Sequence, residues 1–143
     1  MKFSELKEGS VVYHACIRNS ELESGEIKAK QVSHVQECSI ISNIEIYFSD
    51  NTMIIPGKEE ESTIRGINSL SNLLEPFNFS IYSTSYNLCL ETLSRIISTK
   101  LSQISSDYNK LNTQMARMCL MSSVVRNIEK KKESVVLEPV YAD

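Results

Sequence analysis

The feature that most constrains this sequence is a long stretch without a helix breaker. No glycine or proline occurs between Tyr86 and Lys132, and apolar residues recur there at alternating intervals of three and four positions. Such spacing places side chains on one side of an α-helix, at the a and d positions of a heptad repeat. The positions are Ile97, Leu101, Ile104, Tyr108, Leu111, Met115, Met118 and Val125, with Ser122 as the polar exception.

An unbroken helix of this length would extend roughly 65–70 Å at 1.5 Å per residue. A domain formed by the rest of the chain is too small to cover so long an apolar stripe. We therefore predict that these a and d residues form a homo-oligomer interface, as in a coiled coil. The alternative is a helical hairpin broken at Ser105–Ser106–Asp107, a cluster able to cap a second helix. No glycine supports a turn there, and the heptad runs through it without a phase change, which favours a continuous helix.

The sequence before the helix has the alternation of β-strands. Ser10 to Ile17 alternates in a way that predicts a strand with one core face. Further strands are predicted at 26–36, 43–49, 52–55 and 77–82. Helical spacing after Ser62–Thr63 predicts a short helix near residues 63–75. Ser83, Thr84 and Ser85 are candidate N-caps for the long helix.

These elements predict an α+β fold with three parts. Residues 1–85 form a small antiparallel SH3-like β-barrel that includes the short helix. Residues 86–132 form the long C-terminal helix or helical hairpin. The start of this helix, through Leu90, Leu93 and Ile97, is expected to cover the open face of the sheet. Residues 133–143 form an extended tail, in which Pro139 is unsuited to a central strand.

Composition limits the classes of function. The chain has 143 residues, 41% hydrophobic and 23% charged, which is typical of a folded domain. Its net charge of −3 argues against a nucleic-acid partner, since phosphate binding needs a clustered basic surface. No segment approaches the run of about 20 apolar residues that a membrane span requires. The charged N-terminus does not resemble a signal peptide, so we expect a cytoplasmic protein.

One group of residues has the composition of a metal site. His14 and Cys16 lie two positions apart, and His34 and Cys38 four positions apart. Two adjacent strands could present these nitrogen and sulfur ligands to zinc. Structural zinc sites usually use CxxC pairs, which are absent, and isolated thiols are most often small buried side chains. We therefore predict no metal and no cofactor.

Signatures of catalysis are also missing. The sequence has no glycine-flanked nucleophile of the G-x-S-x-G type and no glycine-rich phosphate loop. We predict that the chain is not an enzyme. Should it be one, His14 and His34 are the only general-base candidates. A ligand-binding role would instead draw on the anion and stacking contacts of Arg95, Tyr108, Arg117 and Arg126.

Two short motifs suggest a relationship. Leu6 to Tyr13 reads LKEGSVVY, and Ile81 to Thr84 reads IYST. In these motifs the sequence resembles a diffuse group of small phage and prophage proteins, which open with LKxGxxVY and have a small β-barrel and a C-terminal helix. The resemblance implies a viral accessory or virion-associated role.

We therefore expect a non-enzymatic phage structural or assembly protein in the host cytoplasm. The alternative location is in association with the virion. The protein would bind itself and another protein. The alternative is a phage inhibitor of host defence that binds a host protein or sequesters a small signalling molecule in an oligomer pocket.

Overall fold

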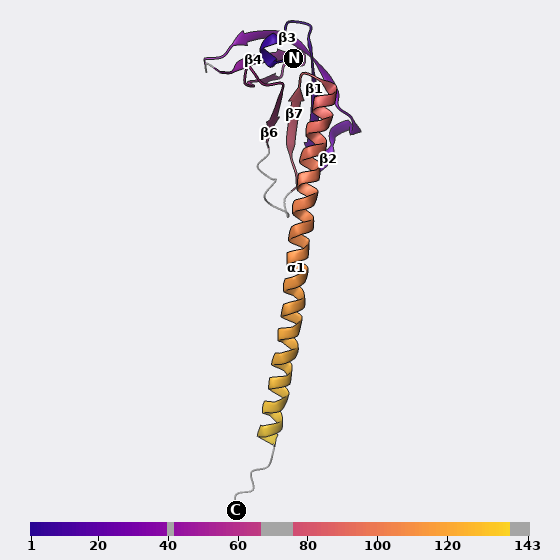
Figure 1. Ribbon diagram of the computed structural model, residues 1–143, viewed down its shortest axis with the longest axis vertical. Helices are drawn as coiled ribbons and strands as arrows, with labels where there is room; N and C mark the ends of the chain where they lie inside the picture. The colour runs from indigo at the N-terminus through magenta and orange to yellow at the C-terminus, as the bar shows by residue number, and fades with distance from the viewer. Residues whose placement is uncertain (40–41, 67–75, 138–143) are drawn as a thin grey trace, which may run out of the picture. The chain divides into compact units, whose positions relative to one another are not determined.

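The computed structural model describes residues 1–39, 42–66 and 76–137, and side chains as far as residue 132. It has an α+β fold, in which a curled antiparallel sheet precedes one long helix, α1 (Tyr86–Leu137) (Figure 1). The predicted fold class is confirmed at this level. The chain divides into two units, which we call unit 1 (Met1–Lys100) and unit 2 (Leu101–Asp143).

The sheet belongs entirely to unit 1. Its strands are β1 (Val11–Arg18), β2 (Glu21–Leu22), β3 (Lys28–Glu37), β4 (Ile44–Phe48), β5 (Met53–Ile54), β6 (Ser62–Arg65) and β7 (Phe79–Ser83). The order is β5-β4-β3-β1-β7-β6, with every pairing antiparallel and with β2 beside the end of β1. Two short 3-10 turns, η1 (Phe3–Glu5) and η2 (Glu23–Gly25), complete the unit.

Strand β3 gives the sheet its curl. It pairs with β1 through residues 28–31 and with β4 through residues 32–37, with an irregularity between Val32 and His34. A bulge of this kind bends a strand and increases its twist. The two outermost strands are joined by a side chain, since the Arg65 guanidinium donates a hydrogen bond to the Met53 carbonyl at 3.2 Å. The described residues form no main-chain ladder between β5 and β6, so the sheet is a half-barrel.

The sheet is buried on both of its faces, each over a different part. One core lies inside the curl and contains Phe3, Leu6, Val12, Val32, Ile44, Ile46, Phe48, Ile54 and Tyr82. The other lies on the opposite face and contains Ala15, Ile17, Phe77, Phe79, Ile81, Cys89, Leu93 and Ile96. Strand β1 contributes Val12 to the first core and Ala15 to the second. The prediction of a single core face for this strand was therefore wrong, because a strongly bent sheet can use both faces.

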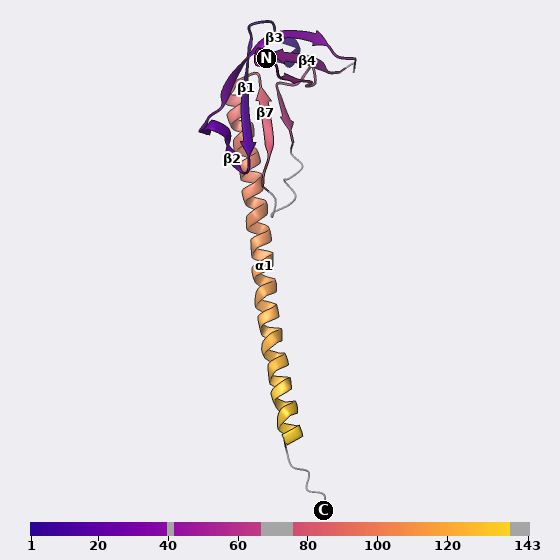
Figure 2. The same cartoon turned by 180° about the vertical axis from the view of Figure 1, so that it is seen from behind.

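The first turns of α1 cover the second core. Figures 1 and 2 show this part of the helix beside β1 and β7. Its contacts are made by Cys89, Leu93 and Ile96. Of the candidate N-caps, Ser85 caps the helix, since its hydroxyl accepts the Leu88 N–H at 3.2 Å.

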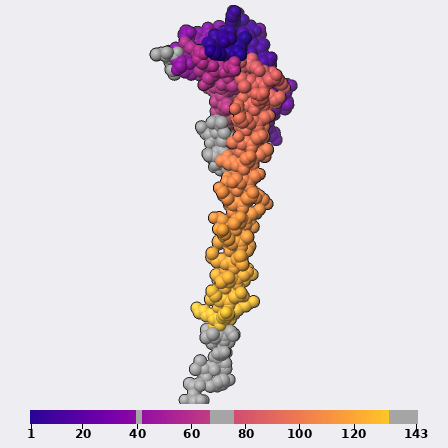
Figure 3. Space-filling view, in the orientation of Figure 1, coloured from indigo at the N-terminus to yellow at the C-terminus, as the bar shows by residue number. Residues whose placement is uncertain are grey.

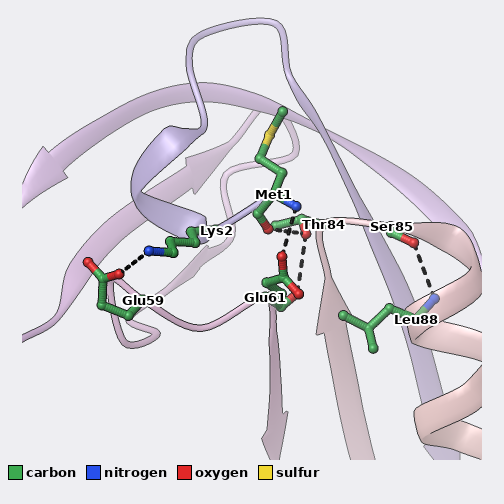
Figure 4. A network of polar contacts seen from close by, with 7 residues as sticks. All are labelled: Met1, Lys2, Glu59, Glu61, Thr84, Ser85 and Leu88. Atoms are coloured by element: carbon green, nitrogen blue, oxygen red, sulfur yellow. Dashed lines mark hydrogen bonds and ion pairs between the residues drawn. The ribbon is translucent and has the colours of Figure 1, made fainter.

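The N-terminus is fixed against the β6 end of the sheet. Phe3 is fully buried, and its N–H donates to the Glu60 carbonyl at 2.8 Å. Figure 4 shows the Met1 ammonium directed at Glu61, 3.0 Å away, and Lys2 directed at Glu59. In the space-filling view, the first residues, in indigo, lie against the purple and magenta residues of the sheet (Figure 3).

Two predicted elements differ from the structure. Residues 62–65 form strand β6 rather than the start of the short helix, because they pair with β7 from Ser62 opposite Ser83 to Arg65 opposite Ser80. The rest of that predicted helix, residues 67–75, lies outside the described residues. Helix α1 continues to Leu137, so the first five residues of the predicted tail, 133–137, are helical. No proline or glycine separates them from the helix, and residues 138–143 lie outside the described residues.

Candidate functional sites

The predicted oligomer-interface residues lie on one side of α1. Ser105–Ser106–Asp107 does not interrupt the helix, so the hairpin alternative is wrong for this structure. Seven of the interface residues belong to unit 2, and the exposed fractions of their side chains run from 40% to 65%. Ile97 belongs to unit 1 and is 38% exposed. We call this row of residues the seam: Ile97, Leu101, Ile104, Tyr108, Leu111, Met115, Met118 and Val125.

The described side chains of unit 2 leave the seam uncovered. Of these side chains, residues 101–132, none is buried, and only Asp107 is partly buried. Unit 2 is therefore a helix whose apolar side chains have no packing partner among its own described residues. A helix gains most of its stability in water from tertiary packing of an apolar face. This arrangement is typical of a helix whose partner is another polypeptide.

The helical part of unit 1 has a different pattern. Leu93 and Ile96 are buried against the sheet, but Leu90 and Ile97 are 45% and 38% exposed. The prediction that Leu90 and Ile97 cover the sheet was wrong, while Leu93 is placed as predicted. The sequence could not choose between these neighbouring faces, because apolar residues occur on both.

A second apolar row was missed by the sequence analysis. Leu120, Val124 and Ile128 are each more than half exposed, and they follow one another at intervals of four residues. That spacing is visible in the sequence, so the signal was present. Together with Met121, these residues widen the apolar surface beyond the a and d positions near the end of the described helix. The widened part offers more contact area than a narrow two-helix seam requires.

The proposed anion contacts are not brought together within one chain. Tyr108, Arg117 and Arg126 follow at intervals of nine residues, which separates successive members by about 13 Å along a helix. Nine residues also turn the helix by about half a revolution, so Arg117 points away from the face of the other two. Arg95 lies in unit 1 and is exposed. A shared ligand would require residues from more than one chain.

A polar cleft of about 220 Å³ lies in unit 1, at the end of β1 away from Val12. Its lining combines one imidazole, one thiol and five charged groups: His14, Cys16, Glu23, Glu26, Lys28, Lys30 and Asp50. The position follows from the register, since His14 pairs with Lys28 on one side and with Tyr82 on the other. Alternation along β1 then places Cys16 on the same face as His14.

An ion pair, a hydroxyl and two aromatic rings surround the Lys30 ammonium in the cleft. The Lys30 ammonium lies 3.0 Å from Asp50 and donates to the Thr52 hydroxyl at 3.0 Å. It also lies 5.3 Å and 5.6 Å from the ring centres of Phe48 and Tyr82, which are cation–π distances. Hydrogen bonding from Thr52, aided by Lys30, lowers the pKa of Asp50 to about 2. This carboxylate is therefore ionised at neutral pH.

His14 is held in its neutral form. Its ring stacks on Tyr82 with centres 4.2 Å apart, and its Nε2 atom is buried without a hydrogen-bond partner among the described residues. Burial, with repulsion from Lys30, lowers the pKa of His14 to about 4. A general base works best with a pKa near the working pH. His14 is consequently a weak base at neutral pH, which does not favour the catalytic alternative for this residue.

The residues of the hypothetical zinc site are far apart in the register. β1 and β3 pair with His14 opposite Lys28, six positions along β3 from His34. The two histidine rings stack on different tyrosines, Tyr82 and Tyr47. Across residues 1–39, 42–66 and 76–137, no three His, Cys, Asp or Glu side chains are grouped so that they could hold a metal ion. Cys16 instead donates a hydrogen bond to Glu23, which lowers the pKa of that carboxyl.

Comparison with protein-family models, curated proteins and solved structures finds no match for this chain. Within the described part of the chain, no helix combines the length and hydropathy needed to cross a membrane. The described residues thus present two candidate functional features, the seam and the cleft.

Proposed function

We propose that this protein is a non-enzymatic assembly protein that associates with copies of itself through the seam on α1. The observation that carries the proposal is the exposure of the seven unit 2 seam residues, of which none is buried in the chain. Folded monomers rarely expose continuous apolar patches of more than about 300–600 Å². The seam has no buried member from Leu101 to Val125, and its regular a and d spacing matches a second helix of the same kind.

The residues beside the seam support self-association rather than an isolated helix in water. Single exposed helices are usually supported by pairs of opposite charges four residues apart. Between Leu101 and Val125, ten of the 18 residues outside the seam are serine, threonine, asparagine or glutamine, and three are charged. Such uncharged polar side chains can approach a neighbouring helix without a desolvated charge. The thioether side chains of Met115 and Met118 also adapt readily to a packing partner.

The biological setting that we propose is a viral structural or assembly role in the host cytoplasm. It depends on the LKEGSVVY and IYST motifs and on the order of a β-domain followed by a helix. We further propose that the β-domain is an SH3-like barrel used to dock another protein. The bent strand β3, shared by both halves of the sheet, and the Arg65 contact between the end strands support that classification.

The test of self-association compares two charge substitutions in the full chain. Leu111→Asp places a carboxylate in the seam, where a partner helix would bury it unpaired at a cost of several kcal/mol. Thr113→Asp adds the same charge two residues away, on the opposite side of the helix. Light scattering at about 100 μM should find oligomers for the unmodified protein and for Thr113→Asp, and monomers for Leu111→Asp. A monomeric unmodified protein at that concentration would overturn the proposal.

A further inference from the structure

The heptad repeat of the seam continues toward the start of α1, into the part of the helix that belongs to unit 1. Counting back from Leu101 as position a, Ser94 and Asn87 are a positions, and Ile97 and Leu90 are d positions. All four side chains are exposed. The buried side chains of this segment are Cys89 and Ile96 at c, Leu93 and Lys100 at g, and Thr92 at f. The sheet therefore covers the c, f and g side of the helix and leaves the a and d side open.

From this placement we propose that α1 pairs with a second copy of itself in parallel and in register, from Asn87 to Val125. The pairing would bring the unit 1 part of α1 into the interface together with the seam residues of unit 2. The inference rests on the proposed self-association and goes beyond it by fixing the direction of the partner and the extent of the contact. The continuous d row, Leu90, Ile97, Ile104, Leu111, Met118 and Val125, is apolar throughout.

The polar a positions decide between the two possible directions. In a parallel, in-register pair, each a residue faces its own copy, so that Asn87 meets Asn87 and Ser94 meets Ser94. The polar groups can then bond to one another, and a buried asparagine at an a position is a known determinant of register in parallel pairs.

The antiparallel pair over the same span places polar residues against apolar ones. An antiparallel a residue faces a d residue, which sets Ser94 against Met118 and Ser122 against Leu90. Asn87 would face Val125. Each such contact buries a hydroxyl or amide without a partner, which is unfavourable. Only the parallel arrangement matches polar with polar at every such layer.

Disulfide trapping in the full-length protein tests this direction. The background carries Cys119→Ser, because Cys119 is an exposed thiol. Ser94→Cys and Ser122→Cys are then introduced separately, one in each unit. A disulfide needs Cα atoms about 4.4–6.8 Å apart, which facing a positions of a parallel pair satisfy. Ser106→Cys, at an outward f position, is the matched control.

After mild oxidation, both Ser94→Cys and Ser122→Cys should give mostly covalent dimers on a non-reducing gel, reversed by a reductant. The background chain and Ser106→Cys should remain mostly uncrosslinked. If an equal mixture of Ser94→Cys and Met118→Cys chains gives the mixed dimer instead, while Ser94→Cys alone does not, the pair is antiparallel and the inference is wrong. Crosslinking at Ser122→Cys but not at Ser94→Cys would overturn the extension of the interface into unit 1.

Light scattering of each variant before oxidation separates the two proposals. A variant that is oligomeric but fails to crosslink contradicts only the direction or extent of pairing. A monomeric background chain contradicts self-association itself.

Discussion

The two parts of helix α1 have similar apolar content but different surroundings. In the part that belongs to unit 1, Leu93 and Ile96 are buried by the sheet, whereas no described side chain of unit 2 is buried. The a and d side of the helix is nevertheless exposed in both parts. The two sides of the helix therefore differ in use: one side completes the core of the β-domain, and we propose that the adjacent, exposed side serves association.

Removing the helix from unit 1 should have the largest effect. A fragment of residues 1–85 lacks Cys89, Leu93 and Ile96, and truncating a single buried leucine or isoleucine already costs about 2–5 kcal/mol. Their combined loss approaches the whole stability of a typical domain, about 5–15 kcal/mol. We expect fragment 1–85 to give a poorly dispersed amide NMR spectrum and fragment 1–100 to fold as a monomer. A well-dispersed spectrum and a cooperative melt for fragment 1–85 would show that α1 serves association alone.

A pair of leucine substitutions should distinguish the two sides of the helix more finely. Leu93 is 6% exposed and Leu90 is 45% exposed, three residues apart. In a chain kept monomeric by Leu111→Asp, Leu93→Ala should lower the free energy of unfolding by about 3 kcal/mol, whereas Leu90→Ala should change it by less than about 1 kcal/mol. Urea unfolding measures both values. Equal losses would mean that the sheet does not discriminate between the two sides.

Much of the fold could be predicted from the sequence, because the spacing of apolar residues indicates which residues share a face. The long helix, the antiparallel strands and a cap among Ser83, Thr84 and Ser85 follow from local patterns of that kind. Periodicity does not report which face a distant strand will cover. Leu90 and Leu93 are equally apolar, and the choice between them depends on where Ile17 and Ile81 place the second core.

The strand at residues 62–65 and the polar cleft were missed for a related reason. Ser62 to Arg65 has helical spacing with the residues that follow, but pairing with β7 overrides that local preference. His14 and Lys30 are 16 positions apart in the sequence, and only the register of β1 with β3 brings them to one cleft. The seam residues could be assigned to one side of α1 from the sequence because they lie on a single helix, where spacing alone fixes the face.

A lower pH should reduce the stability of unit 1 and leave association through α1 nearly unchanged. We expect this change in stability to be the smallest of the predicted effects. The pKa of His14 falls from 6.5 to about 4 on folding, so the folded state binds fewer protons than the unfolded state between these values. The stability that depends on a neutral His14 ring is complete above pH 6.5 and is lost as the pH falls toward 4. The shift corresponds to about 3.4 kcal/mol in full, and because the imidazole is only half-buried we expect about 1 kcal/mol between pH 7 and pH 5.

The measurement is urea unfolding of the Leu111→Asp chain at these two pH values. His14→Phe keeps a ring against Tyr82 but cannot titrate, so its loss of stability between pH 7 and pH 5 should be smaller by about 1 kcal/mol. His34→Asn, on the other stacked histidine, should keep the full dependence. Association of the unmodified protein should change little over the same range, because no histidine occurs in the helix. If His14→Phe retained the pH dependence, the loss would have to arise from the carboxylates around the cleft, and His14 would not be the group that links acid to the stability of unit 1.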